Sequence, residues 1–305
     1  MASKVLDRVY RILPEWLRQF VQLTASSVSS WLEHRASSKG AALSFYTLFS
    51  VSPILVLAIA VAGYFFGEAA ARGQLLGELR TLMGENGAEA IQALLAAASN
   101  PDSGRIATLV ATLLLIVGAT SVFAELKASL DELWEVEDKQ EGGIIGLIKT
   151  RLLSFGLVLV LAFLLMVSLV VNAALKIAEQ YIGGIWTSSA GLLTSISTLV
   201  SYGVIAFLFA VIYKMLPATQ IAWRDVWIGA GVTAALFVVG KYLIGLYLGN
   251  SAVTSGFGAA GSLIALMLWV YYSAQIFFLG AEFTRQFALT CGSQCPTRRN
   301  RNTSQ

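Results

Sequence analysis

Long runs of uncharged, mostly apolar residues alternate along this chain with shorter segments that hold nearly all of its charge. Each run comes close to the ~20 residues that a helix needs to cross the hydrocarbon core of a bilayer. The pattern predicts an all-α, polytopic membrane protein with six transmembrane helices. The predicted spans are residues 41–66, 106–123, 152–175, 192–213, 226–248 and 259–279.

The segments at the two ends of the chain differ from the spans. From Val5 to Phe20, apolar positions recur at helical spacing, and Pro14 is expected to bend this helix or to start a second one. This amphipathic helix either lies in the inner membrane interface or docks on the bundle. The predicted domains are a cytoplasmic amphipathic N-terminal segment (1–38), a six-span membrane domain (39–290) and a disordered cytoplasmic tail (291–305).

Two loops between spans also carry apolar stripes. Apolar residues at 75–83 and at 91–95 predict two short amphipathic helices on the outer side of the membrane, after the first span. Residues 125–141, after the second span, align Leu126, Leu130 and Leu133 on one side of a helix. The carboxylates of this segment indicate a solvated helical face or, alternatively, a site for a cation or a partner. They are Glu125, Asp131, Glu132, Glu135, Glu137, Asp138 and Glu141.

Composition agrees with a membrane protein, and the basic residues indicate its orientation. The chain is 56% hydrophobic and 13% charged, whereas a typical soluble domain is roughly 25% charged. Cytoplasmic loops of membrane proteins are enriched in Lys and Arg. With the N-terminus inside, only Arg72, Arg80, Arg105 and Lys176 fall in outer segments, and Lys241 falls within a span. Both termini are therefore expected in the cytoplasm.

The sequence lacks the sets of residues that most catalytic and metal sites need. His34 is the single histidine, so Cys291 and Cys295 cannot complete a four-ligand zinc site. There is no Gly-rich phosphate loop ending in Gly-Lys-Ser and no Gly-x-Ser-x-Gly motif. The formal net charge of +3 gives no indication of nucleic-acid binding. We expect no catalytic residues, no metal, no cofactor and no nucleic-acid partner.

Polar groups inside the spans are the remaining candidates for function, because each is costly in lipid unless it is paired or faces water. Lys241 either snorkels to the surface, pairs with a backbone carbonyl, or meets an anionic lipid headgroup. Asn172 and Gln275 are candidates for interhelical hydrogen bonds or for ligand contacts. Trp269 and Tyr272 lie near the middle of the last span, where they indicate either a packed bundle centre or a cavity lining.

The first span contains hydroxyl groups and a helix breaker within one apolar run. Pro53 frees the carbonyl of Phe49, and Ser50 and Ser52 are expected to supply donors for it. The resulting kink either improves packing or forms part of a transport path, as discontinuous spans do in transporters. In the second case, cargo passes between the first span and the last two. The cargo-binding or gating candidates are Lys241, Pro53, Ser50, Tyr46, Trp269, Tyr272, Gln275 and Asn172.

Four segments of the chain resemble one known family. They are KGAALSFYTLFSVSPILVLAIA (39–60), GATSVFAELKASLDELWEV (118–136), LPATQIAWRDVWIGAGVTAALF (216–237) and YLGNSAVTSGFGAAGSLIALMLWVYYSAQIFFLGAEF (247–283). Together they are similar to the YihY/BrkB family of bacterial inner-membrane proteins. The resemblance implies a six-span helical protein of the bacterial cell inner membrane that looks like an envelope-associated transporter. It supplies no catalytic residues, and the ribonuclease BN label that the family has carried does not fit a chain with one histidine.

The leading functional hypothesis is a transporter or flippase-like protein for an amphiphilic envelope molecule, such as a phospholipid or a lipid-linked precursor. The alternative is a non-transporting membrane scaffold that organises envelope machinery. The expected partners are membrane lipids, anionic ones among them, and, for a scaffold, envelope proteins. Residues 249–262, which are uncharged and rich in Gly and Ser, form either a re-entrant turn or an external loop.

Overall fold

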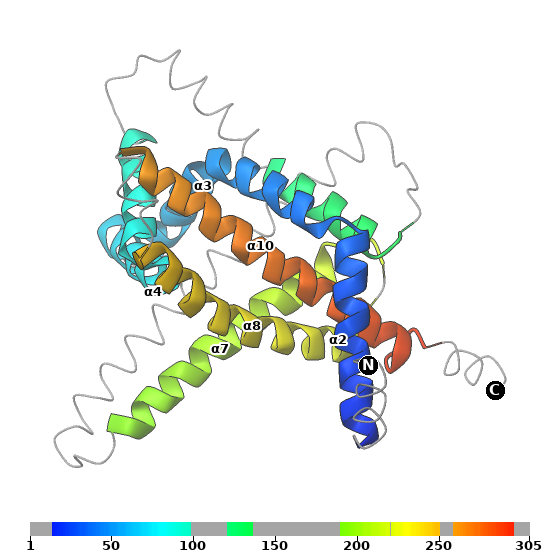
Figure 1. The fold of residues 1–305 in the computed structure, drawn as a ribbon. Helices are drawn as coiled ribbons and strands as arrows, with labels where there is room; N and C mark the ends of the chain where they lie inside the picture. The colour runs from blue at the N-terminus through cyan, green and yellow to red at the C-terminus, as the bar shows by residue number, and fades with distance from the viewer. Residues whose placement is uncertain (1–13, 99–120, 137–189, 220, 251–258, 296–305) are drawn as a thin grey trace.

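The computed structural model describes residues 14–98, 121–136, 190–219, 221–250 and 259–295 (Figure 1). Within these residues the chain forms helices and no strand, which confirms the all-α prediction for this part. A helical stretch at 121–133 accompanies six longer helices. Their bounds are α2 (Glu15–Glu33), α3 (Ala36–Phe66), α4 (Glu68–Ala98), α7 (Ala190–Met215), α8 (Trp223–Asn250) and α10 (Ala259–Thr290).

Three helices in the described residues are long and apolar enough to cross a membrane. The candidate spans are Thr198–Met215, Trp223–Leu248 and Leu263–Thr290, and α3 adds a fourth if its two arms are taken as one span. These four agree with the predicted first, fourth, fifth and sixth spans. The predicted third span, at 152–175, and most of the second, at 106–120, lie outside the described residues.

The first of these candidate spans is bent. The two arms of α3, Ala36–Ser52 and Ile54–Phe65, meet at 45°. Pro53 lies at the break between the arms. A proline has no backbone N–H, so the helix loses one hydrogen bond at this position. The predicted kink is therefore confirmed, and its cause is local to the sequence.

α10 is the central element of the described bundle. It packs against α8, α3, α2 and α4, while α7 packs against α8. In Figure 1, α10 is drawn in orange and red and crosses the middle of the view between α3 and α8. The largest buried cluster includes Phe278 of α10, Tyr213 of α7 and Leu130 of the 121–133 helix, each 0% exposed. The core thus follows the C-terminal half of α10.

Small residues let α8 and α10 approach each other at two matching positions. A Cβ added to Gly229 would lie 1.8 Å from Thr284 Oγ1, and one added to Gly280 would lie 1.9 Å from Thr233 Oγ1. Each helix therefore presents a glycine and a threonine four residues apart, with the threonine of one helix over the glycine of the other. Both hydroxyls donate at 2.7 Å to the glycine carbonyl of their own helix, so the crossing leaves neither hydroxyl unpaired.

α4 is helical from Glu68 to Ala98 but folds back on itself. Leu75 and Leu95 are buried in the same cluster with Ile59 of α3. In a straight helix the roughly 20 residues between these leucines would hold them ~30 Å apart. The helix therefore reverses its direction between an arm that contains Leu75 and an arm that contains Leu95. Gly84 and Gly87 lie between these two positions in the sequence. The prediction of two separate short helices is corrected to two arms of one element, both packed on α3.

α2 begins directly after Pro14, which stands at its N-cap with φ of −57°. This position agrees with a second helical segment that starts at the proline, because proline has no donor to lose there. α2 docks on α10, with the rings of Phe20 and Phe283 centred 6.3 Å apart. Of the two alternatives for the N-terminal helix, docking on the bundle describes α2. Residues 1–13 lie outside the described part, so a position of that segment in the membrane interface stays a prediction.

The helix at 121–133 buries its predicted apolar stripe. Leu126, Leu130 and Leu133 are 8%, 0% and 0% exposed. Its carboxylates do more than face solvent, because several of them meet cations of the same chain. The ion pairs are Lys39–Glu132, Lys127–Asp131 and Arg285–Glu135. The Glu132 and Glu135 side chains are nevertheless 62% and 65% exposed, which agrees with the solvated-face alternative.

Residues 291–295, at the start of the predicted disordered tail, pack against α8. The backbone N–H and the hydroxyl of Ser293 donate to Asp225 Oδ2 at 2.8 and 2.6 Å. Gly292 fits beside the same carboxylate, because a Cβ there would lie 2.6 Å from Asp225 Oδ2. The chain therefore keeps a defined path for five residues beyond α10, and residues 296–305 lie outside the described part.

Candidate functional site

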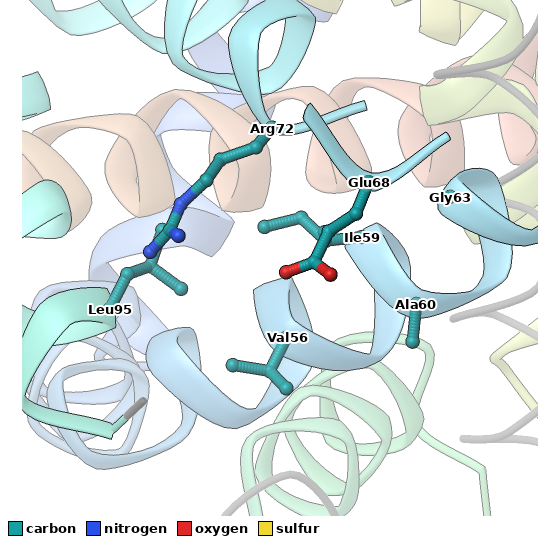
Figure 2. A pocket seen from close by; sticks show the side chains of 7 residues that line it. All are labelled: Val56, Ile59, Ala60, Gly63, Glu68, Arg72 and Leu95. Atoms are coloured by element: carbon teal, nitrogen blue, oxygen red, sulfur yellow. The ribbon is translucent and has the colours of Figure 1, made fainter. Parts of the chain in front are cut away.

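A pocket of about 320 Å³ opens between α3 and α4, and we call it the α3–α4 pocket (Figure 2). Ligand pockets generally measure ~300–1,000 Å³, so this volume suits a small molecule or the polar end of a larger one. α3 supplies an apolar wall, and α4 supplies two charged groups and a leucine. The lining residues are Val56, Ile59, Ala60 and Gly63 of α3, and Glu68, Arg72 and Leu95 of α4.

The two charged groups of the pocket have no charged partner in the described part of the chain. Neither the Glu68 nor the Arg72 side chain forms an ion pair or a hydrogen bond there. Figure 2 shows the carboxylate and the guanidinium pointing into the pocket from different sides. Glu and Arg in this order and four residues apart on a helix often pair. In the α3–α4 pocket, the Glu68 carboxylate and the Arg72 guanidinium stay apart, beside the apolar wall supplied by α3.

The start of α4 lies close to α3 because two glycines permit it. Gly67, which joins the helices, has φ of 87°, a left-handed conformation that residues with a Cβ rarely adopt. A Cβ added to Gly63 would lie 3.2 Å from Glu68 Cα. The tight turn brings the backbone of Glu68 against α3, and Glu68 itself stays exposed at the edge of the pocket.

The polar residues of the first span do not line this pocket. Ser50 Oγ donates to the Tyr46 carbonyl at 2.9 Å, and Ser52 Oγ donates to the Leu94 carbonyl of α4 at 3.3 Å. The expectation that these hydroxyls supply donors to the carbonyl of Phe49 is therefore wrong. A helical serine reaches the carbonyl four residues earlier more readily than a nearer one, and Ser52 instead joins α3 to α4.

The mid-span candidates of α10 pack against neighbouring helices. A Cβ added to Gly40 of α3 would lie 2.2 Å from Gln275 Nε2, and one added to Gly240 of α8 would lie 3.0 Å from Tyr272 Cε1. Within the described part of the chain, the polar side-chain atoms of Gln275 and Trp269 are buried without hydrogen-bond partners. For Trp269 and Tyr272 the arrangement corresponds to the packed-centre alternative, and neither residue lines the α3–α4 pocket. The interhelical hydrogen bond predicted for Gln275 is not found among the described residues.

Lys241, in α8, is not among the residues that line the α3–α4 pocket. Its Nζ is 5.3 Å from the ring centroid of Tyr242, and Tyr242 is 65% exposed. A cation over an aromatic face gains roughly 0.5–1 kcal/mol at an exposed site. The predicted contact of Lys241 with an anionic headgroup stays a prediction. Asn172 lies outside the described residues.

Sequence reasoning missed a second group of side chains, which we call the buried charge cluster. It joins His34, Glu135, Glu282 and Arg285. Three of these side chains are mostly buried, whereas Glu135, at the edge of the cluster, is 65% exposed. His34 Nδ1 lies 2.6 Å from Glu282 Oε1, and Arg285 lies 2.6 Å from Glu135 Oε1. Longer contacts of 3.8 Å link Arg285 to Glu282 and His34 to Glu135. The Glu282 side chain is 0% exposed, and within the described residues its Oε2 is buried without a hydrogen-bond partner. Its charge is therefore compensated mainly through the contact of Oε1 with His34.

Backbone turns bring the cluster together. His34 stands at the C-cap of α2, and Arg35 after it has φ of 50°, so the chain turns sharply into α3. Glu135 has φ of 48° just after the 121–133 helix ends. Positive φ is uncommon for residues with a Cβ and occurs at sharp turns. Both turns direct an ionisable residue towards α10.

The length of the last span explains why Glu282 was not recognised. Sequence analysis ended that span at residue 279, so Glu282 counted as a group beyond the membrane. The apolar window instead runs Leu263–Thr290 and contains Glu282 and Arg285. The spacing of Glu282 and Arg285, three residues apart, was a usable signal for an ion pair on one helix face.

The helical bundle and its long apolar helices define the chain as an α-helical membrane protein. The chain belongs to the family described as Virulence factor BrkB, which matches residues 27–302. This match confirms the resemblance to the YihY/BrkB family that the four sequence segments indicated. No solved structure matches the chain.

Curated relatives carry the same general description. A UPF0761 membrane protein of Alkalilimnicola ehrlichii is 25% identical over 90% of this chain and 60% of its own length. Another, of a Psychrobacter species, is 22% identical over 95% of this chain and 52% of its own length. A third, of Pseudoalteromonas translucida, is 23% identical over 89% of this chain and 85% of its own length. The chain thus spans little more than half the length of the first two relatives.

Proposed function

We propose that this protein is a transporter or flippase-like protein for an amphiphilic envelope molecule, a phospholipid or a lipid-linked precursor. The observation that carries the proposal is the α3–α4 pocket, in which Glu68 and Arg72 face the space above apolar groups of α3. An amphiphile has the same division into a charged end and an apolar body. The proposal includes no enzymatic role, since the sequence offers no catalytic set of residues.

The proposed setting is the bacterial inner membrane, with six spans and both termini in the cytoplasm. On that topology the C-terminal end of α3 and the start of α4 face the outside, which puts Glu68 and Arg72 at headgroup level in the outer leaflet. Arginine is well suited to such a position, because its planar guanidinium binds phosphate through two parallel hydrogen bonds.

The topology predicts the accessibility of single cysteines. In a variant lacking Cys291 and Cys295, a cysteine at exposed position Glu89 of α4 is expected to react with a membrane-impermeant maleimide in intact spheroplasts. A cysteine at exposed position Glu33, which ends α2, is expected to react only after the membrane is opened. Labelling of position 33 in sealed spheroplasts would reverse the proposed orientation.

The transport proposal predicts a measurable effect of Arg72. Purified protein in liposomes is expected to speed the exchange of a fluorescent phospholipid between leaflets, followed by chemical quenching of the outer leaflet. Losing one charge-assisted hydrogen bond to phosphate costs about 1.5–3 kcal/mol, so Arg72→Met is expected to slow exchange roughly 10- to 100-fold. Arg80→Met is the matched control, because Arg80 also lies on α4 but pairs with Glu85 at an exposed site. Lys241→Ala tests the other candidate cation in the same assay.

The outcome also addresses the scaffold alternative. Wild-type liposomes that exchange lipid no faster than empty ones, together with fixed protein partners on co-purification, would favour a scaffold and contradict transport. An acidic helix that recruits partners needs unengaged carboxylates. Glu132, Asp131 and Glu135 are instead engaged by cations of the same chain, which supports transport over recruitment through this segment.

A further inference from the structure

We infer that the α3–α4 pocket selects a zwitterionic headgroup, with a phosphate at the Arg72 guanidinium and a primary ammonium at the Glu68 carboxylate. The inference rests on the proposed function and names the class of amphiphile. It differs from the anionic headgroup predicted for Lys241, because the pocket offers one charge of each sign. The argument uses the separation of those charges, the balance between them and the volume around them.

The separation of the two charges suits a ligand that carries one charge of each sign. Glu68 and Arg72 are four residues apart on α4 with the acid first, an arrangement that favours a direct ion pair. The structure holds the two groups beyond ion-pair distance, and both side chains point into the same space. A ligand that carries both charges would form an ion pair with each of these groups. Its phosphate would accept hydrogen bonds from the guanidinium, and its ammonium would donate to the carboxylate.

The charge balance discriminates between headgroups. A purely anionic headgroup would gain Arg72 but would also meet the negative charge of Glu68 in a partly apolar space, where like charges repel more strongly than in water. A zwitterionic headgroup with a primary ammonium satisfies both groups. A repulsive group placed against the wrong ligand is a common source of specificity, and Glu68 has that role here.

The volume and the wall of the pocket indicate how much of the ligand enters. About 320 Å³ lies at the low end for ligand pockets, so the pocket accommodates a headgroup and not a whole lipid. The apolar wall formed by Val56, Ile59 and Ala60 continues along α3. We place the glycerol and the upper acyl chains along this wall, where they bury apolar surface against α3.

The test compares two lipids with identical acyl chains. Full-length protein in detergent is titrated with phosphatidylethanolamine or phosphatidylglycerol, and binding is followed by native mass spectrometry. We expect the wild type to bind phosphatidylethanolamine about tenfold more tightly. Glu68→Gln should remove most of this preference by weakening phosphatidylethanolamine and strengthening phosphatidylglycerol, whereas Arg72→Met should weaken both lipids. Glu89→Gln is the matched control, since Glu89 is an exposed acid on the same helix outside the pocket lining.

Each alternative outcome has a distinct meaning. Equal binding of both lipids by the wild type, or an unchanged preference in Glu68→Gln, overturns the headgroup inference while transport can still be observed in liposomes. Displacement of the lipid by an equal concentration of free phosphoethanolamine would identify a soluble zwitterion as the occupant and overturn the lipid assignment. If neither lipid binds and none is exchanged, the proposed function itself is wrong. Glu68 has no partner to lose, so an unchanged melting temperature is expected and confirms folding of Glu68→Gln.

Discussion

Replacing Gly280 with alanine is expected to force α8 and α10 apart and to destabilise the protein far more than the same substitution at a glycine with open space around it. The new Cβ would lie 1.9 Å from Thr233 Oγ1 and 2.7 Å from the Tyr213 hydroxyl. Neither group moves freely, because Thr233 donates to Gly229 and Tyr213 donates to the Phe277 carbonyl at 2.7 Å each. Overpacking of a well-packed site costs about 1–3 kcal/mol, and we expect the upper end of that range.

The measurement is unfolding of purified protein in mixed micelles, followed by tryptophan fluorescence. Gly245→Ala is the matched control, since Gly245 also lies in α8 but has open space around its Cα. There alanine is expected to be neutral or to stabilise the helix by up to ~1 kcal/mol. Adding Thr233→Ala to Gly280→Ala should restore part of the loss by removing the nearest clashing atoms. Equal effects of the two single glycine substitutions would contradict the close crossing.

Replacing Arg285 with methionine is the second large expected effect. The guanidinium lies 2.6 Å from Glu135 Oε1 and 3.8 Å from Glu282 Oε2, and the Glu282 side chain is 0% exposed. Removing one partner of a buried ion pair costs about 3–5 kcal/mol, because a charge stays buried without compensation. Glu282 keeps its contact with His34, so we expect a loss near 3 kcal/mol in the same unfolding measurement.

Arg80→Met is the control for this effect. Arg80 pairs with Glu85 at 3.1 Å, but both side chains are more than half exposed, and such surface pairs contribute about 0–1 kcal/mol. A second comparison adds Glu282→Gln to Arg285→Met, which removes the unpaired charge and should recover part of the stability. A loss in Arg285→Met no larger than in Arg80→Met would show that the cluster does not stabilise the fold.

The features that sequence predicted well are those whose causes lie within a few residues. Pro53 bends its own helix by removing one donor, and the stripe of Leu126 and Leu130 follows from helical spacing alone. The apolar runs of α7, α8 and α10 can likewise be recognised from their composition alone. None of these predictions requires knowledge of which other segment of the chain packs against the element.

The features that sequence reasoning missed depend on which segments meet in space. His34, Glu135 and Glu282 are separated by about a hundred residues or more along the chain, and no local pattern marks them as partners. The α3–α4 pocket depends on α4 folding back, so that Leu95 lies across from Arg72. The candidates Tyr272 and Gln275 were singled out from their place in the last span, but their close packing against α8 and α3 depends on glycines of those helices.

The buried charge cluster also constrains how the chain matures during synthesis. Its members come from the N-terminal helix, from the middle of the chain and from the last helix, so the contacts of His34 and Glu135 with α10 close only after α10 has left the ribosome. About 250 residues separate His34 from Arg285, which corresponds to roughly 10–50 s at ~5–20 residues per second. Throughout that interval α2 has no α10 to dock on, and a nascent chain that stops before residue 282 lacks the carboxylate that His34 contacts.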